Sequence, residues 1–227
     1  MKCMILAAGR GERMRPHTDV MPKPLIPVAG TPLIARHLEN LRAAGVTDIV
    51  INLGWLGERI REAVGDGARF GVGVRYSEEG WPALESGGGI FNALPLLGHE
   101  PFMVVNGDVY SDFPLARLAQ RARELPAGRL AHLVLVPNPE HNPRGDFALA
   151  DGRLDNHEQG RFTFSGLSVH TAEFFHGCTP GHFPLLPLWR RSAGLGHLGG
   201  EVYEGIWSDV GTPERLAALE QRLRKRA

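Results

Sequence analysis

Short apolar runs alternate along the chain with segments whose apolar residues have helical spacing. The run Met4 to Ala8 stops at Gly9, which is typical of a buried parallel strand that leads into a glycine-rich loop. Further strands are expected at residues 48–53, 72–76, 102–105, 130–136 and 162–169. Helices are expected at residues 31–41, 56–64, 90–96, from 112 onward, and at 212–224.

Several of the expected helices begin with capping signals. Thr31 and Thr212 are each followed by proline, which is the pattern of an N-cap residue with proline at the first helical position. Asp112 is expected to open a helix with Pro114 in its first turn. Because strands and helices alternate, the sequence predicts an α/β fold with a doubly wound, mostly parallel sheet. Residues 138–161 are rich in Gly, Pro, Asn and His, so we expect turns and short strands there, forming a small substrate-covering lobe over the sheet edge.

Composition and charge exclude several classes of protein. Lysine and arginine number 25, and so do aspartate and glutamate, so no overall field attracts nucleic acid or anionic lipid. Cys3 and Cys178 lie far apart and outside any CxxC spacing, which argues against a disulfide framework or zinc site and favours a reduced, cytoplasmic setting. The apolar stretch after Met1 is too short to cross a bilayer, so neither a signal peptide nor a membrane anchor is expected.

The glycine-rich segment from Gly9 to Met14 directly follows the first expected strand. Its backbone N–H groups can wrap an anionic phosphate chain, because glycine has no Cβ to block close approach. A dinucleotide-binding fingerprint needs a small residue where Met14 stands. A P-loop is also excluded, because Lys23 follows Gly11 at the wrong distance and no Ser or Thr comes directly after Lys23.

Two aspartates are candidates for a magnesium site. Asp108 follows the apolar strand 102–105, at the edge of an open α/β sheet where ligands bind. Mg²⁺ usually takes one or two protein carboxylates and completes its shell with phosphate oxygens and water. Asp209, just before the last expected helix, is the candidate for the second carboxylate, although an Asx turn beside Thr212 is the alternative.

Glu85 precedes the glycine run 87–89, which is expected to open a helix and to cup a flat base. Its carboxylate can accept a hydrogen bond from a base N–H. Uracil has one such imide donor and guanine has two adjacent donors, whereas cytosine lacks the N3 proton, so uridine and guanosine both remain open. The alternative is a glycine-rich helix start with Glu85 merely exposed to solvent.

The residues around this loop carry a family resemblance. The pattern Leu6-Ala7-Ala8-Gly9-x-Gly11-x-Arg13-x-x-Pro16-x-Thr18, followed by Pro22-Lys23-Pro24-Leu25-x-Pro27-Val28, resembles the signature of the sugar-1-phosphate nucleotidyltransferases. The resemblance implies a Rossmann-like, GT-A-like fold and a Mg²⁺-dependent enzyme that joins a sugar 1-phosphate to a nucleoside triphosphate. It also implies that Arg13 holds the β- and γ-phosphates and that Lys23 bridges the α-phosphate and the sugar phosphate. The residues that it implies bind the nucleotide are Ala7, Ala8, Gly9, Gly11, Arg13, Lys23, Glu85 and Gly88, with Asp108 and Asp209 on the metal.

In detail the chain is similar to the bacterial uridylyltransferases that use UTP and N-acetylmuramate α-1-phosphate in peptidoglycan recycling. This resemblance implies that Asn106, Gly145, Asp146 and Ser165 lie near the sugar. It implies one nucleotidyltransferase domain over residues 1–227, with approximately 1–110 binding the nucleotide and 111–227 forming the sugar-binding part and C-terminal helix. Only small-molecule partners are expected, with neither nucleic acid nor membrane, for a monomer or small homo-oligomer.

Three other functions remain as alternatives. The same fold can activate mannose 1-phosphate with GTP, or glucose 1-phosphate with dTTP. A cytidylyltransferase is the second alternative, although Glu85 complements cytosine poorly. The third is a non-catalytic nucleotide-sugar sensor, since fold alone does not fix function; the joint presence of Arg13, Lys23, Asp108 and Asp209 argues against it.

Overall fold

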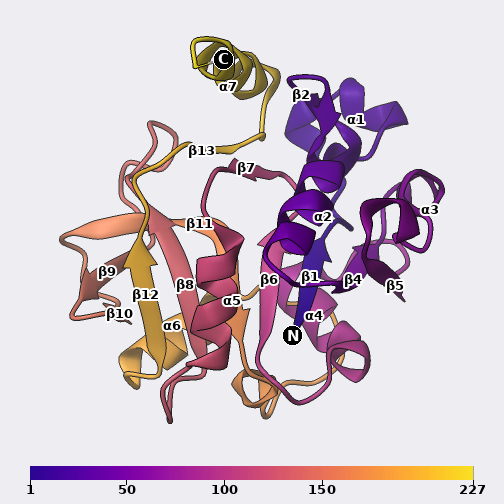
Figure 1. Cartoon of the computed structure of the whole chain (residues 1–227). Helices are drawn as coiled ribbons and strands as arrows, with labels where there is room; N and C mark the ends of the chain where they lie inside the picture. The colour runs from indigo at the N-terminus through magenta and orange to yellow at the C-terminus, as the bar shows by residue number, and fades with distance from the viewer. Residues whose placement is uncertain (227) are drawn as a thin grey trace.

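A nine-stranded sheet runs through the molecule in the computed structural model, which describes residues 1–226 (Figure 1). Its strands are β1 (Lys2–Leu6), β4 (Asp48–Leu53), β5 (Gly73–Glu78), β6 (Phe102–Asn106), β8 (Ala131–Val136), β9 (Phe147–Ala150), β10 (Arg153–Asp155), β11 (Arg161–His170) and β12 (Leu198–Val202). Their order is β5-β4-β1-β6-β11-β8-β12-β10-β9. Strands β5, β4, β1 and β6 are parallel neighbours, as are β8 and β12, whereas β11 and β10 run the opposite way. The predicted α/β fold with a mostly parallel sheet is confirmed.

Helices cover both faces of this sheet, as a doubly wound fold requires (Figure 1). The helices are α1 (His17–Val20), α2 (Leu33–Ala43), α3 (Gly57–Val64), α4 (Glu85–Leu97), α5 (Leu115–Arg123), α6 (Leu186–Gly194) and α7 (Pro213–Arg224). Alternate residues of β1 enter two separate cores, because successive side chains of a strand point to opposite faces. Cys3 and Ile5 pack with α2, α3 and α5, whereas Met4 packs with α4 and α6.

The C-terminal helix α7 folds back over the N-terminal segment. Leu219 of α7 shares a small buried cluster with Met14, Val28 and Val210. The predicted N-cap of this helix is confirmed, because the Thr212 hydroxyl accepts a hydrogen bond from the backbone N–H of Arg215. Helix α7 therefore ties the end of the chain to the loop that follows β1.

Two other predicted helix starts are wrong. Thr31 and Pro32 form the short strand β3 (Thr31–Pro32), which pairs with β2 (Pro27–Val28), so α2 begins at Leu33 with no side-chain cap. Asp112 does not cap α5, because its carboxylate accepts hydrogen bonds from Tyr203 and from the backbone of Ile206. In both cases a contact with another segment takes over a residue that the local pattern assigned to a helix.

The region 138–161 holds the short strands β9 and β10, which extend the sheet at its far edge. Turns and short strands at this edge were predicted, and they are confirmed. The sequence did not predict α6 and β12, nor the ribbon of β7 (Val109–Ser111) and β13 (Trp207–Asp209). No helix within residues 1–226 combines the length and apolar character needed to span a bilayer.

Candidate active site

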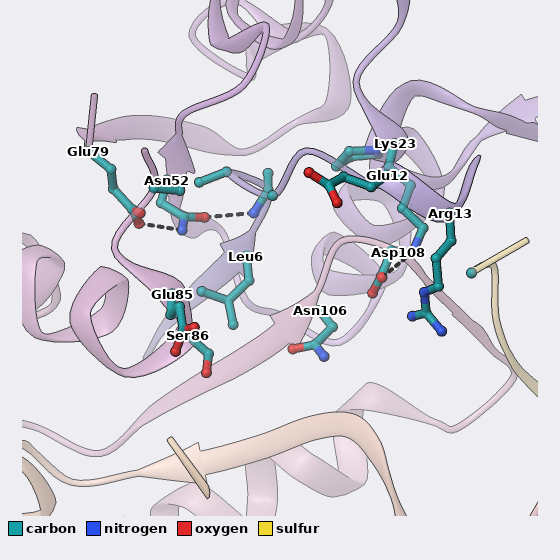
Figure 2. A pocket seen from close by; sticks show the side chains of 17 residues that line it. Leu6, Glu12, Arg13, Lys23, Asn52, Glu79, Glu85, Ser86, Asn106 and Asp108 are labelled. Atoms are coloured by element: carbon teal, nitrogen blue, oxygen red, sulfur yellow. Dashed lines mark hydrogen bonds and ion pairs between the residues drawn. The ribbon is translucent and has the colours of Figure 1, made fainter. Parts of the chain in front are cut away.

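A cavity of about 470 Å³ opens at the carboxyl ends of β1, β4, β5 and β6 (Figure 2). We call it the first cavity. Its lining residues are Leu6, Ala7, Ala8, Gly9, Gly11, Glu12, Arg13, Lys23, Pro24, Asn52, Glu79, Ala83, Glu85, Ser86, Asn106, Asp108 and Gly211. The cations Arg13 and Lys23 lie toward one end, and Asn52, Glu79 and Glu85 lie toward the other (Figure 2). This position at the carboxyl edge is where open α/β sheets bind ligands.

The glycine loop gives the first cavity a wall of backbone. Gly11 has a φ of +67°, and a Cβ there would come 3.1 Å from the side chain of Thr18, so the fold itself requires glycine. The Thr18 hydroxyl donates to the Gly11 carbonyl at 2.9 Å and fixes this turn. A Cβ added at Gly9 would come within 4 Å of no described residue other than its two chain neighbours. Packing therefore does not require glycine at Gly9, which fits a backbone that a ligand approaches closely.

The structure separates the basic residues of this region into two pairs. Arg10 and Arg15 both bind Asp19, at 3.0 and 2.9 Å, and neither lines the first cavity. Arg13 and Lys23 do line it. Lys23 is 7% exposed, and its ammonium donates to the Asp108 carboxylate. Two of the four cations are thus placed for an anionic ligand.

The ribbon of β7 and β13 brings the two candidate metal aspartates together. Asp209 stands opposite Val109 in the antiparallel register, and the backbone N–H of Val210 donates to the Asp108 carbonyl at 2.9 Å. Both aspartates line a second cavity of about 320 Å³, which shares Arg13, Asn106 and Asp108 with the first. Acids from distant parts of the chain therefore face one space beside the glycine loop.

The contacts of these carboxylates fit a divalent ion that arrives with a phosphate ligand. One Asp209 oxygen accepts from Arg215 at 2.6 Å, whereas Oδ1 is buried without a hydrogen-bond partner and lies 3.2 Å from His141 Nε2. Within residues 1–226 no group of three or more His, Cys, Asp or Glu side chains is arranged to hold a metal. Two carboxylates suit Mg²⁺, which takes its remaining ligands from phosphate and water, better than a zinc-like cage built from protein alone.

The second cavity contains part of the predicted sugar-binding set. Asn106 and Ser165 line it, but Gly145 and Asp146 do not. Asp146 instead accepts from the backbone N–H of Phe164 at 2.7 Å, so its carboxylate fixes the strand that carries Ser165. Gly145 packs against Arg161 and has a φ of +63°, so the turn itself requires glycine. The lining residues that were not predicted as site residues are Val109, His141, Asn142, Thr163, Phe164, Gly166 and Trp207.

The glycine run in α4 packs closely against other parts of the protein. The backbone N–H of Gly88 donates to the Phe183 carbonyl at 3.0 Å, and a Cβ at Gly88 would clash with the Gly181 carbonyl. Gly88 lines neither of the two cavities, so its contact with the nucleotide stays a prediction. Glu85 does line the first cavity, with a φ of +60° and an oxygen 3.6 Å from His182 Nε2.

A polar chain at one end of the first cavity was also missed from sequence. The side-chain oxygen of Asn52 accepts a hydrogen bond from the backbone N–H of Ala7 at 2.6 Å, and its side-chain nitrogen donates to the Glu79 carboxylate at 2.6 Å. The other Glu79 oxygen accepts from the backbone N–H of Leu84 at 2.8 Å. Burial raises the pKa of Glu79 above its ordinary value. Asn52 lies near the carboxyl end of the apolar strand β4, and Asp108 lies just beyond the end of β6, so a similar sequence signal points to both.

Histidines outside these cavities have structural surroundings. His170 is fully buried, and its Nε2 accepts from the Trp189 indole N–H at 3.0 Å. Burial lowers the pKa of His170 to about 3 and that of His37 to about 4, which keeps both rings neutral near pH 7. Both histidines therefore belong to the core.

Comparison with known proteins agrees with this arrangement. The pattern of the Nucleotidyl transferase family matches residues 2–147. The N-acetylmuramate alpha-1-phosphate uridylyltransferase of Neisseria meningitidis is 50% identical over 95% of each chain, and that of Caulobacter vibrioides is 37% identical over 97% of this chain and 96% of the relative. A crystal structure described as a glucose-1-phosphate thymidylyltransferase from Bacillus anthracis has the same fold, with a TM-score of 0.88 at 21% identity over 99% of this chain and 95% of that one. The chain belongs to the Nucleotidyl transferase family, and the protein is a nucleotidyltransferase.

Proposed function

We propose that the protein transfers a uridylyl group from UTP to N-acetylmuramic acid 1-phosphate, giving UDP-N-acetylmuramic acid and pyrophosphate, and that it acts in peptidoglycan recycling. The observation that carries the proposal is the meeting of two cavities at Asp108, Asn106 and Arg13. One cavity has a wall of glycine backbone, and the other has a wall of polar side chains. The choice of UTP and of this sugar phosphate is supported by the two relatives named above, whose similarity covers nearly the whole chain.

In this proposal UTP occupies the first cavity. The backbone of Gly9 and Gly11 wraps the triphosphate, Arg13 holds the β- and γ-phosphates, and Lys23 holds the α-phosphate. Ala7 and Ala8 add backbone contacts near the base or ribose. Glu85 accepts the uracil imide N–H. The Glu79 carboxylate lines the same end, but both of its oxygens already accept hydrogen bonds from protein groups.

The sugar 1-phosphate occupies the second cavity, with Asn106 and Ser165 facing it. A phosphate oxygen of the sugar attacks the α-phosphorus in line, the bond from that phosphorus to the bridging oxygen breaks, and pyrophosphate leaves. The attacking oxygen is already an anion near pH 7, so the site needs alignment and charge neutralisation rather than a general base. Lys23 provides fixed positive charge where negative charge accumulates. Asp108 and Asp209 would hold Mg²⁺, which neutralises phosphate charge when it is bound.

The proposal extends to organisation and location. Residues 1–227 form one domain, with the nucleotide held by approximately residues 1–110 and the sugar by the part from 111 onward. The partners are small molecules, and the protein is a monomer or small homo-oligomer. A cytoplasmic location is supported by Cys3 and Cys178, which are both free thiols.

A pyrophosphate-release assay with paired substrates tests the proposed function. UTP, GTP, dTTP and CTP are each combined with the 1-phosphates of N-acetylmuramic acid, N-acetylglucosamine, glucose and mannose. We expect the highest kcat/KM with UTP and N-acetylmuramic acid 1-phosphate. A higher value for another pair would replace the proposed substrates. Nucleotide binding without pyrophosphate release for any pair would favour the non-catalytic sensor.

Arg215 is expected to position the Asp209 carboxylate. The Arg215 side chain is 17% exposed, and its guanidinium donates to the Asp209 carboxylate at 2.6 Å. The guanidinium also lies against Gly211, where a Cβ would clash with it. We expect Arg215→Ala to weaken Mn²⁺ binding about 10- to 100-fold, the usual cost of removing a group that orients a metal ligand. Electron paramagnetic resonance of Mn²⁺ with a non-hydrolysable UTP analogue measures this directly.

Arg222→Ala is the matched control for the Arg215 variant. Arg222 lies on the same helix, is exposed, and lines a neighbouring third cavity together with Arg215 and Asp209. Its removal should leave Mn²⁺ affinity unchanged, whereas Arg215→Lys should restore part of the loss. Equal weakening in both alanine variants would mean that general positive charge, and not the orientation of Asp209, governs the affinity.

A further inference from the structure

Three side chains outside the first cavity form a continuous stack. The Arg10 guanidinium lies over the Trp55 ring, 3.7 Å from its centroid, and the Trp55 and Trp81 ring centroids are 5.5 Å apart at an interplanar angle of 59°. We call these three residues the Trp55 stack. Its members come from three loops that follow β1, β4 and β5 in turn. None of the three residues is among the described residues that line the first cavity. The roles proposed for the nucleotide-, metal- and sugar-binding residues therefore do not account for the stack.

Trp55 is the fixed member of the stack. Its backbone N–H donates to the Ala8 carbonyl at 3.1 Å, and its indole N–H donates to the Thr18 carbonyl at 2.9 Å. Gly54 lies so close to Ala8 that a Cβ there would come 2.7 Å from the Ala8 carbonyl oxygen. Trp55 is therefore attached to both ends of the segment that contains the glycine loop.

Arg10 is held against Trp55 and does not line the first cavity. One end of its guanidinium binds Asp19 at 3.0 Å, and Nη1 is buried without a hydrogen-bond partner. The face of the Trp55 ring supplies the electrostatic attraction that this buried nitrogen otherwise lacks. Arg10 lies within the glycine loop, and its contacts join that loop to Asp19 and Trp55.

Trp81 lies in the segment that forms the opposite wall of the first cavity, although its own side chain does not line that cavity. It is 56% exposed, an unusual position for a tryptophan, and it stands between Glu79 and Ala83, which both line the cavity. Its neighbours Gly80 and Pro82 are also exposed. Hydrogen bonds hold Glu79 and Leu84 on either side, and the contact with Trp55 fastens the exposed residues 80–82 between them to the rest of the molecule. The stack joins the two walls of the cavity from outside.

We infer that the Trp55 stack determines how tightly the nucleotide is held, by fastening segment 79–86 to the glycine loop on the far side of the ligand. This inference rests on the proposed binding of UTP in the first cavity. Trp81 acts as a positioning residue, because it touches the wall and not the nucleotide or the reacting phosphates. An aromatic contact of this kind corresponds to about a ten-fold change in affinity. The chemical step depends on Lys23 and Asp108 at the other end of the cavity, so kcat should be spared.

The test uses the whole chain with Trp81→Ala, Trp81→Phe and Leu195→Ala. Leu195 is a matched control, since it is an exposed apolar residue (64%) outside both cavities. Isothermal titration with UTP and Mg²⁺, together with steady-state kinetics, should give about ten-fold weaker UTP binding for Trp81→Ala. Its kcat at saturating UTP and its KM for the sugar phosphate should stay within about two-fold of wild type. Trp81→Phe should recover most of the affinity, and Leu195→Ala should match wild type.

A second measurement covers the case in which Trp81→Ala fails to fold. UTP binding to wild type should change tryptophan emission, and Trp81→Phe should reduce that change. Three outcomes would overturn the inference. A folded Trp81→Ala variant could bind UTP with wild-type affinity, or it could lose kcat and affinity equally. The third is an emission change that Trp81→Phe leaves intact. If the wild-type protein does not bind UTP, the proposed function fails. The affinity of the nucleotide that does bind is then measured for the same variants.

Discussion

Asp108→Asn and Asp209→Asn should each lower magnesium-dependent turnover by about a thousand-fold or more while the protein stays folded. Asparagine keeps the size of the side chain but removes the negative charge that Mg²⁺ requires. Both positions line the second cavity, and neither carboxylate is fully buried, since the side chains are 37% and 22% exposed. The loss should therefore appear in kcat rather than in stability.

Initial rates of pyrophosphate release across a Mg²⁺ titration, with thermal unfolding as a check on folding, measure this prediction. Asp48→Asn is the matched control, because Asp48 forms an ion pair with Arg75 in which both side chains are nearly half exposed. Such a pair contributes little to stability, so this variant should keep wild-type rates. Near-normal turnover in either Asp108→Asn or Asp209→Asn would remove that residue from the proposed metal site.

Lys23→Ala is expected to lower kcat by about a thousand-fold, with a smaller change in KM for UTP. Lys23 is the buried cation between Asp108 and the glycine loop, so its charge acts most strongly as the phosphates develop negative charge in the transition state. Lys23→Arg should restore little activity. A site that leaves lysine only 7% exposed has little room for the larger planar guanidinium.

Arg15→Ala is the control for Lys23→Ala within the same segment. Arg15 pairs with Asp19 and does not line the first cavity, so its removal should change kcat by less than about two-fold. Single-turnover kinetics separates the chemical step from product release in each variant. A Lys23→Ala enzyme with normal kcat and a raised KM would make Lys23 a binding residue instead of a catalytic one.

The sequence predicted the glycine loop and the two aspartates because each depends on a local pattern. Gly9 follows an apolar strand, and Asp108 follows another, so the end of each strand can be located from hydrophobicity alone. Parallel strands bring their carboxyl ends to one edge of a sheet, which places these two features together without further information. Thr212 likewise caps α7 through its near neighbour Arg215.

The glycines show where local reasoning fails. Gly9 and Gly88 look alike in sequence, yet Gly9 faces the first cavity and Gly88 packs against Gly181. A glycine indicates only that something approaches closely, and the sequence does not say whether that is a ligand or another part of the chain. Asp146 was placed near the sugar by the family resemblance; in the structure its carboxylate accepts a hydrogen bond from the backbone N–H of Phe164.

By itself the sequence determined the class of fold, the glycine loop and the candidate acids, because strand ends and glycine turns are properties of neighbouring residues. Only the tertiary structure decided that Asp209 lies beside Asp108, that Asn52 and Glu79 close one end of the first cavity, and that Trp81 meets Trp55. Those contacts join segments that are distant along the chain. They depend on strand order and loop packing, which the whole core fixes and no short stretch of residues encodes.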